Sequence, residues 1–181
     1  MFIEDIEKKV VEICEAEGIF QEKMKPHENF LFALKVTYPP GHPHPNHLVV
    51  VVPKNKQYIS IELATKISPQ HLDAFKKLEE QTGTSLIPLF FYLLRNMLLN
   101  RNLFYQFNAN NYSYVFSEHI YFDGLTMNSF YQAIRKIYYA SVSAQITIND
   151  VASGKFKGIR MPSKMEDTEE SQGSPEDLFY S

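Results

Sequence analysis

The chain is poor in cysteine, glycine and tryptophan: its 181 residues include one Cys, seven Gly and no Trp. The lone Cys14 excludes an intramolecular disulfide and any zinc site built from several cysteines. The glycines never occur as G-x-G and no G-x-S-x-G is present, so phosphate-binding loops and the nucleophile elbow of hydrolases are missing. These absences disfavour an enzyme without excluding one, and we expect no catalytic residues and no cofactor.

Long hydrophobic runs are also missing. The longest one, Leu89–Leu94, is far shorter than the roughly 18–20 residues that span a bilayer. The N-terminal segment MFIEDIEKKVVEI is charged from its first turn, unlike a secretory signal. A single cysteine suits a reducing compartment. Together these features predict a cytoplasmic protein that does not enter a membrane.

Residues 1–148, which are predicted to fold, have no excess of positive charge. The sequence has 18 Lys/Arg and 21 Asp/Glu, of which four and seven follow residue 148, which leaves 14 of each before it. Binding to nucleic acids or anionic membranes requires clustered cations. We therefore expect no nucleic-acid partner and keep a nucleic-acid-associated protein only as the second alternative.

Four segments have the apolar spacing of helices. They cover residues 3–17, 69–82, 85–101 and 127–148. Gly18 suits the end of the first, Ser68 caps the second, and Thr126 is the expected N-cap of the last. The third is apolar nearly all round, which predicts burial on most sides or pairing with another chain. The apolar stripe expected on the last helix is Met127, Phe130, Ile134, Ile137, Tyr138, Val142 and Ile146.

Five segments are predicted to be strands. They cover residues 30–38, 48–52, 58–63, 103–107 and 112–122. The first alternates between apolar and other side chains, as a half-buried strand does, and Pro39 ends it. The second is a β-branched run that should pair antiparallel with the third, and Asn108–Asn111 turns the last two into a hairpin.

The predicted order α-β-β-β-α-α-β-β-α describes one α+β domain over residues 1–150, in which an antiparallel sheet is flanked by helices. Residues 151–181 differ from it: a basic stretch, GKFKGIRMPSK, is followed by an acidic one, MEDTEESQGSPED. Such a composition buries too little apolar surface to offset the entropy lost on ordering. We predict a disordered C-terminal tail.

Three local features accompany this order: the strand that ends at Tyr38–Pro40, the helix start at Ile67–His71, and the motif YFDGLT at Tyr121–Thr126. Together they resemble an uncharacterised archaeal domain-of-unknown-function family with a fold similar to type III secretion chaperones and YbjN-like proteins. The resemblance covers roughly residues 1–150. It implies an antiparallel sheet flanked by helices, allows a homodimer, and provides no catalytic residues.

The loop PPGHPHPNH places His42, His44 and His47 close together, and such imidazoles can bind zinc, nickel or copper. A structural zinc site needs four ligands, and His27 is the obvious further candidate. The alternating prolines instead favour an extended connector with incidental histidines. We predict no metal, and keep a metal- or small-molecule-binding protein that uses this loop, with Asp123, as the first alternative.

Two other residues have chemical potential but a simpler interpretation. Asp123, before Gly124 at a helix start, could serve anion or metal chemistry. No partner is placed beside it by spacing, since Glu118 and His119 should point to opposite faces of a strand. A turn and helix cap is therefore expected. Cys14 has no histidine nearby in sequence and is expected to be a buried apolar residue.

The hairpin strands contain aromatic residues that could stack bases on an open sheet. They are Phe104, Tyr105, Phe107, Tyr112, Tyr114 and Phe116. Because no Lys or Arg is interleaved with them, we favour core and cross-strand packing.

The acidic tail ends in Leu178, Phe179 and Tyr180, a short apolar anchor on a tether that is a candidate for binding a partner. The alternative is a solvated terminus without a role. The leading hypothesis is a non-enzymatic protein-binding or chaperone-like module that binds another protein or a second copy of itself. In this hypothesis the sheet and the 85–101 helix form a groove or dimer face.

Overall fold

The computed structural model describes residues 3–25 and 28–156. Its elements, in chain order, are α1 (Ile3–Ala16), β1 (Phe20–Lys23), β2 (Phe30–Tyr38), β3 (Asn46–Pro53), β4 (Tyr58–Lys66), α2 (Pro69–Thr82), α3 (Leu86–Asn100), β5 (Phe104–Asn108), β6 (Ser113–Tyr121), a short 3-10 turn (Phe122–Gly124) and α4 (Met127–Ala152).

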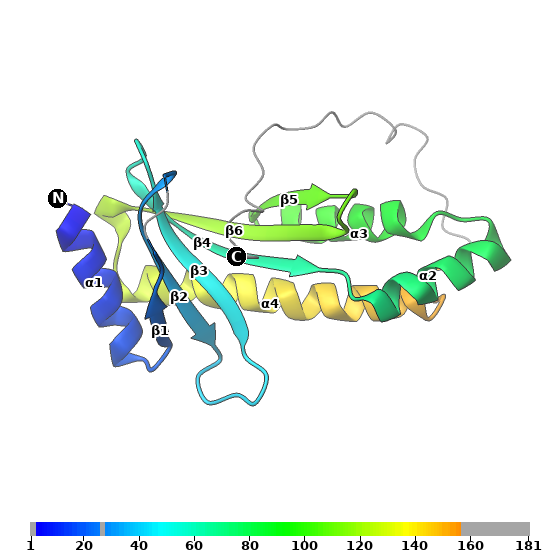
Figure 1. The fold of residues 1–181 in the computed structure, drawn as a ribbon, viewed down its shortest axis with the longest axis horizontal. Helices are drawn as coiled ribbons and strands as arrows, with labels where there is room; N and C mark the ends of the chain where they lie inside the picture. Colours follow the sequence, from blue (N-terminus) through cyan, green and yellow to red (C-terminus); the bar gives the residue numbers. More distant parts are fainter. Residues whose placement is uncertain (1–2, 26–27, 157–181) are drawn as a thin grey trace.

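These elements form two layers, a six-stranded sheet and a layer of helices. All strand pairs are antiparallel, in the order β1-β2-β3-β4-β6-β5. Figure 1 shows α4 running along the sheet, with α1 at one end and α2 at the other. The predicted α+β class, with an antiparallel sheet flanked by helices, is confirmed.

One strand, β1, was not predicted. It contains four residues, of which only Phe20 is partly buried. With three exposed polar side chains it has no alternation of apolar and polar residues to detect. Its existence depends on backbone pairing with β2, from Phe20 beside Val36 to Lys23 beside Leu34.

The predicted helix and turn signals are largely confirmed. Ser68 caps α2 by accepting a hydrogen bond from the His71 backbone N–H, and Gly83 ends the helix with a φ of 66°. At α4, Thr126 and Ser129 form a reciprocal capping box. Asp123 was expected to provide such a cap, but it lies in the exposed 3-10 turn before Thr126.

The apolar surface of α3 is used within the chain. Six of its residues are buried: Leu86, Leu89, Phe90, Phe91, Leu94 and Leu98. Ile87, Leu93 and Met97 are partly buried against the same core. The prediction that α3 is buried on most sides is therefore confirmed. The helix contributes little to an external groove.

The expected stripe on α4 was only partly right. Phe130, Ile134 and Ile137 are buried, but Met127, Val142 and Ile146 are 49%, 39% and 57% exposed. The buried face continues instead through three small residues, Ala133, Ala140 and Ala144. Small side chains bring a helix close to its neighbours, and a pattern of large apolar residues alone does not reveal that face.

The folded part continues past residue 150. α4 ends at Ala152, Val151 is buried, and Phe156 packs against the core. The rest of the predicted tail, with Leu178, Phe179 and Tyr180, lies outside the described residues, so its disorder and its role stay predictions.

Two substitutions test the orientation of α4. Ile137→Ala should lower the free energy of unfolding by about 2–5 kcal/mol because it leaves a cavity at a side chain that is 0% exposed. Ile146→Ala removes the same atoms at a position that is 57% exposed and should change it by less than about 0.5 kcal/mol. Urea unfolding measures both, and equal losses would contradict the orientation.

Candidate functional site

The sheet has one face against the helices and one face turned away from them. On β4 and β6, Ile59 lies opposite Ile120 and both belong to the core. Side chains alternate along a strand, so the next cross-strand pair, Ser60 and His119, lies on the outer face. The aromatic and titratable side chains on this outer face form the candidate site.

Four rings form a continuous row across β5, β6 and β4, which we call the aromatic row: Phe104, His119, Tyr58 and Tyr121. The His119 ring is stacked between Phe104, at a centroid distance of 4.3 Å, and Tyr58, at 4.2 Å. Tyr121 meets Tyr58 edge-on at 5.8 Å. Phe104 is 57% exposed and Tyr121 63%, so the row presents apolar surface to solvent at both ends.

On this face, the surroundings shift the pKa values of three titratable side chains in the direction that favours their uncharged forms. Burial, and then the charge of Lys56, lower the pKa of His119. Burial also raises the pKa of Glu62, although a hydrogen bond of 2.7 Å from the Ser60 hydroxyl partly offsets this. Burial, followed by Tyr121 and Glu62, raises the pKa of Tyr58. A neutral imidazole between neutral rings suits contact rather than charge recognition.

Ser60, His119 and Glu62 are residue types found in hydrolase triads, but their arrangement differs from one. The Ser60 hydroxyl donates to Glu62, and the His119 ring is stacked between Phe104 and Tyr58. Among the described residues no hydrogen bond joins His119 to Ser60. A nucleophile needs an adjacent base within hydrogen-bond reach, so this geometry does not activate Ser60.

Most of the aromatic residues predicted on the hairpin face the core. Phe107 stacks on Phe91 of α3 at 4.8 Å, and Tyr114 meets Phe90 at 5.9 Å. Tyr105 packs against the same core, and Phe116 is 0% exposed. Core packing is confirmed for these four, whereas Phe104 lies on the outer face and Tyr112 is 37% exposed.

The histidine loop between β2 and β3 does not form a ligand cluster. His42, His44 and His47 are exposed. The His44 backbone N–H donates to Nδ1 of His42 at 3.1 Å, and His47 lies 3.3 Å from the Gln21 side chain. Within residues 3–25 and 28–156, no three His, Cys, Asp or Glu side chains are grouped as a metal site would require. His27 lies outside the described residues.

Cys14 is a buried apolar residue, as expected. Its side chain is 0% exposed, and burial, with a smaller effect of Glu15, raises its pKa to about 12. A thiol with so high a pKa carries almost no thiolate near neutral pH, and the thiolate is the nucleophile. Cys14 therefore belongs to the core and not to a reactive site.

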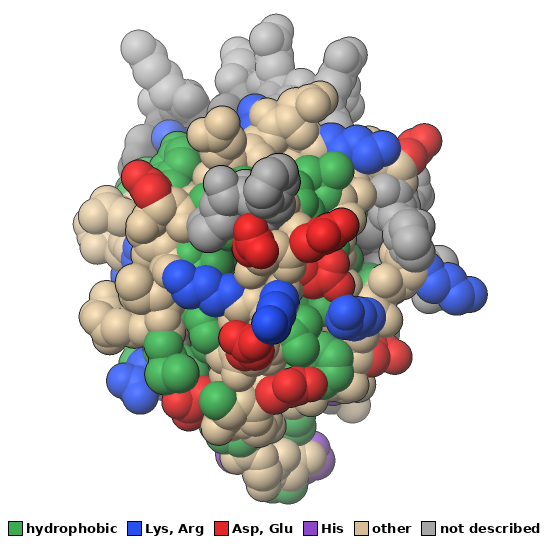
Figure 2. Space-filling model, turned by 90° about the vertical axis from the view of Figure 1, so that its left-hand side faces the viewer, with side chains coloured by type: hydrophobic (Ala, Val, Ile, Leu, Met, Phe, Trp, Pro, Cys, Tyr) green, Lys and Arg blue, Asp and Glu red, His purple; other side chains and the backbone are tan. Residues whose placement is uncertain are grey.

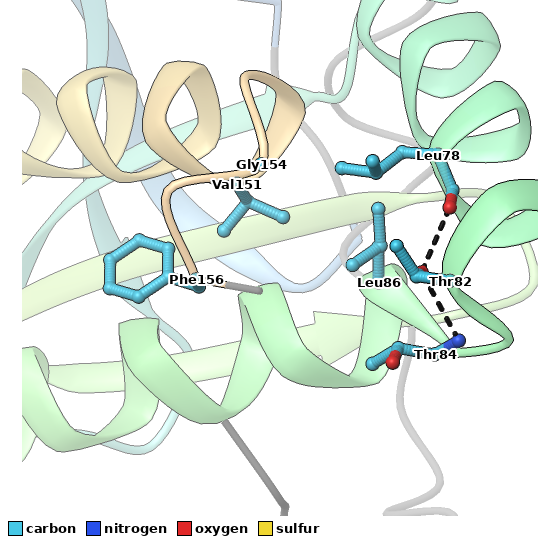
Figure 3. Close-up of a pocket in the computed structure, with 7 residues that line it drawn as sticks. All are labelled: Leu78, Thr82, Thr84, Leu86, Val151, Gly154 and Phe156. Carbon is cyan, nitrogen blue, oxygen red and sulfur yellow. Dashed lines mark hydrogen bonds between the residues drawn. The ribbon is translucent and has the colours of Figure 1, made fainter. Parts of the chain in front are cut away.

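Two concave regions of the described surface are poor active sites. Figure 3 shows an apolar corner between α2, α3 and the end of α4, where Leu78, Leu86, Val151 and Phe156 leave about 10 Å³. That volume holds no more than about one water molecule. A depression along α1 is open and charged, with Lys23 bound to Glu7 at 2.8 Å. Figure 2 shows acidic and basic side chains interspersed at this end of the molecule.

The aromatic row was missed as a unit by sequence reasoning. Tyr58, His119 and Tyr121 were assigned to strands, and His119 was considered only beside Glu118, which indeed points the other way and binds Lys136 of α4 at 2.8 Å. The alternation on β4 and β6 could have revealed the row, because Tyr58, His119 and Tyr121 alternate with the core residues Ile59 and Ile120. The sequence does not show how β4 pairs with β6, because α2, α3 and β5 separate the two strands along the chain.

Two layers, with helices on one face of an antiparallel sheet and a row of rings on the other, define a mixed α+β protein with a sheet face that none of the described helices covers. The chain belongs to the family of uncharacterized conserved proteins DUF2299, whose model matches residues 6–148. This confirms the predicted membership of an uncharacterised family.

One solved structure extends the comparison. The crystal structure of an uncharacterized protein from Methanothermobacter thermautotrophicus is similar, with a TM-score of 0.67 and 23% identity over 80% of this chain and 96% of that chain. This similarity shows the fold alone. No curated protein matches. Among the described residues, no helix has both the length and the hydropathy needed to cross a bilayer.

The inertness of Cys14 can be tested by alkylation. The native protein should resist iodoacetamide at pH 8, because burial and a pKa of about 12 leave almost no accessible thiolate. The same reagent in urea should modify Cys14 completely. Mass spectrometry measures both, and rapid labelling of the folded protein would contradict the burial.

The state of His119 can be followed by NMR titration. Its pKa should lie below the ordinary value of 6.5, so the ring is neutral at pH 7. Lys56→Gln should raise that pKa because it removes a nearby positive charge. Lys54→Gln, in the same turn, is the matched control and should change it less. A pKa at or above 6.5 in the native protein would refute the stacked, partly desolvated environment.

Proposed function

We propose that this protein is a non-enzymatic protein-binding module that holds a segment of a partner protein against the outer face of its sheet. The observation that carries this proposal is the aromatic row, with Phe104 57% and Tyr121 63% exposed at its ends. A chaperone-like role, in which the partner segment is held in an extended form, is the finer version of the same proposal.

The energetics of the row support contact with another protein. Full burial of an exposed Phe side chain contributes about 1.5–3 kcal/mol, and Tyr is enriched among the residues that dominate binding energies. The rings of His119 and Tyr58 are already ordered by stacking at 4.3 and 4.2 Å. Because these rings are preorganised, a partner would lose less side-chain entropy on binding them.

The same geometry disfavours nucleic acid as the ligand. Bases stack on exposed ring faces, but both faces of His119 are covered by neighbouring rings that lie within 20° of parallel. The His119 ring at the centre of the row therefore has no free face on which a base could stack. Glu62 lies on the same face, and the residues before 149 have no excess of Lys and Arg.

The proposal is tested by affinity capture from an extract of the source organism, with nuclease treatment to remove bridging nucleic acid. A double variant, Phe104→Ser with Tyr121→Ser, should lose most of the proteins that the native chain captures, because it removes both exposed ends of the row. The captured proteins are compared by quantitative mass spectrometry.

The matched control is Met127→Ser, which alters an exposed apolar side chain of α4 that belongs neither to the aromatic row nor to the α4 stripe and is 49% exposed. It should leave the captured set unchanged. Circular dichroism confirms that each variant folds. If the row variant captures the same proteins as the native chain, the outer sheet face is not the binding site.

A further inference from the structure

The solvent face of α4 carries a second apolar stripe that the core does not use. Tyr139, Val142 and Ile146 are 58%, 39% and 57% exposed. They follow one another at spacings of three and four, so they lie on one side of the helix. The buried Ala140 and Ala144 lie on the opposite side. The stripe therefore faces away from the sheet and from the aromatic row.

A charged residue lies at each end of this stripe. Arg135 is about one turn before Tyr139, and Asp150 is about one turn after Ile146. The remaining charge on α4, Lys136, binds Glu118 at 2.8 Å and the Asn102 carbonyl at 2.9 Å. The exposed face thus has a cation at one end, an anion at the other and three apolar side chains between them.

The end of α3 extends the apolar surface. Arg101 donates a hydrogen bond of 2.8 Å to the Ser143 hydroxyl, which holds the end of α3 beside the middle of the stripe. Leu99, in the last turn of α3, is 52% exposed. Leu99 therefore adds an exposed apolar side chain at the end of α3, which Arg101 joins to α4.

We propose that two copies of this chain associate through this face, with their α4 helices crossing antiparallel about Val142. Arg135 and Asp150 lie at nearly equal distances on either side of Val142, as do Tyr139 and Ile146. An antiparallel crossing sets Arg135 of one copy beside Asp150 of the other, and Tyr139 beside Ile146. A parallel crossing would set like charges together, which costs free energy.

The charge pattern identifies a second copy as the occupant. One antiparallel copy of α4 supplies the anion for Arg135, the cation for Asp150 and apolar side chains for the stripe at the same time. Within the chain Asp150 pairs with Lys155, and Arg135 lies over the Tyr131 ring at 5.6 Å. Both groups are therefore held in place near the surface. Because the stripe is short, the association is reversible and depends on concentration.

Sedimentation velocity tests this over a series from about 1 μM to about 1 mM, a range that includes weak association. The full chain should convert from monomer to dimer within it. Val142→Arg should remain a monomer throughout, since it places charge at the crossing point. Ile146→Asp is a second variant at an exposed position, in case the first folds poorly. A native chain that stays monomeric, or folded variants that dimerise like it, would overturn the proposal.

A charge exchange tests the antiparallel orientation. Arg135→Glu and Asp150→Arg should each weaken dimerisation about tenfold or more, because each creates two like-charge contacts across the axis. The double variant should return to within about threefold of the native dissociation constant, because the exchanged pairs are again opposite in sign. Phe104→Arg, on the aromatic row, should dimerise normally. No recovery in the double variant, or dissociation by Phe104→Arg, would overturn this interface.

Discussion

The close packing of α4 on the sheet is the contact on which the rest of the structure depends. Ala133, Ala140 and Ala144 are 4%, 0% and 0% exposed and form part of its buried face, where small side chains allow close packing. From this position α4 also holds peripheral parts of the chain. The Asn149 side-chain oxygen accepts a hydrogen bond of 2.8 Å from Nε2 of His71 in α2, and the Ser141 hydroxyl accepts one from Asn46 beside the histidine loop. With α4 in place, the helices occupy one face of the sheet, and within residues 3–25 and 28–156 no helix covers the other.

The uncovered face is divided into two regions with different packing. Toward β2 and β3, Ala33, Val49 and Val51 are 7%, 7% and 1% exposed and form a small apolar cluster with Met24 and Phe30. Toward β4, β6 and β5, the face carries the aromatic row and leaves Phe104 and Tyr121 open. The first region is closed by residues of the chain itself. Among the described residues, the exposed rings Phe104 and Tyr121 lie in the second region, which is where a partner has most to gain.

Local patterns in the sequence predicted most elements because each is determined by near neighbours. Ser68 and Thr126 mark helix starts through their own hydrogen-bonding chemistry, and both positions were predicted correctly. β1 was missed because pairing with β2, not its own side chains, makes it a strand. The buried face of α4 was assigned only in part because three of its buried residues are alanines, which contribute little to an apolar pattern. The row was missed because its rings come from strands whose register spans α2, α3 and β5.

The two proposed surfaces lie on opposite layers, and this has a consequence for binding. The row is on the outer face of the sheet, whereas Tyr139, Val142 and Ile146 face away from the sheet on the helical layer. A partner at the row therefore does not compete with a second copy at α4. Dimerisation through α4 would direct the two rows outward, in opposite directions. A partner with two suitable segments on a long enough linker could then be held at both rows, and its avidity would exceed the affinity of either site. Self-association would in this way strengthen the capture of extended chains without adding a contact to either row.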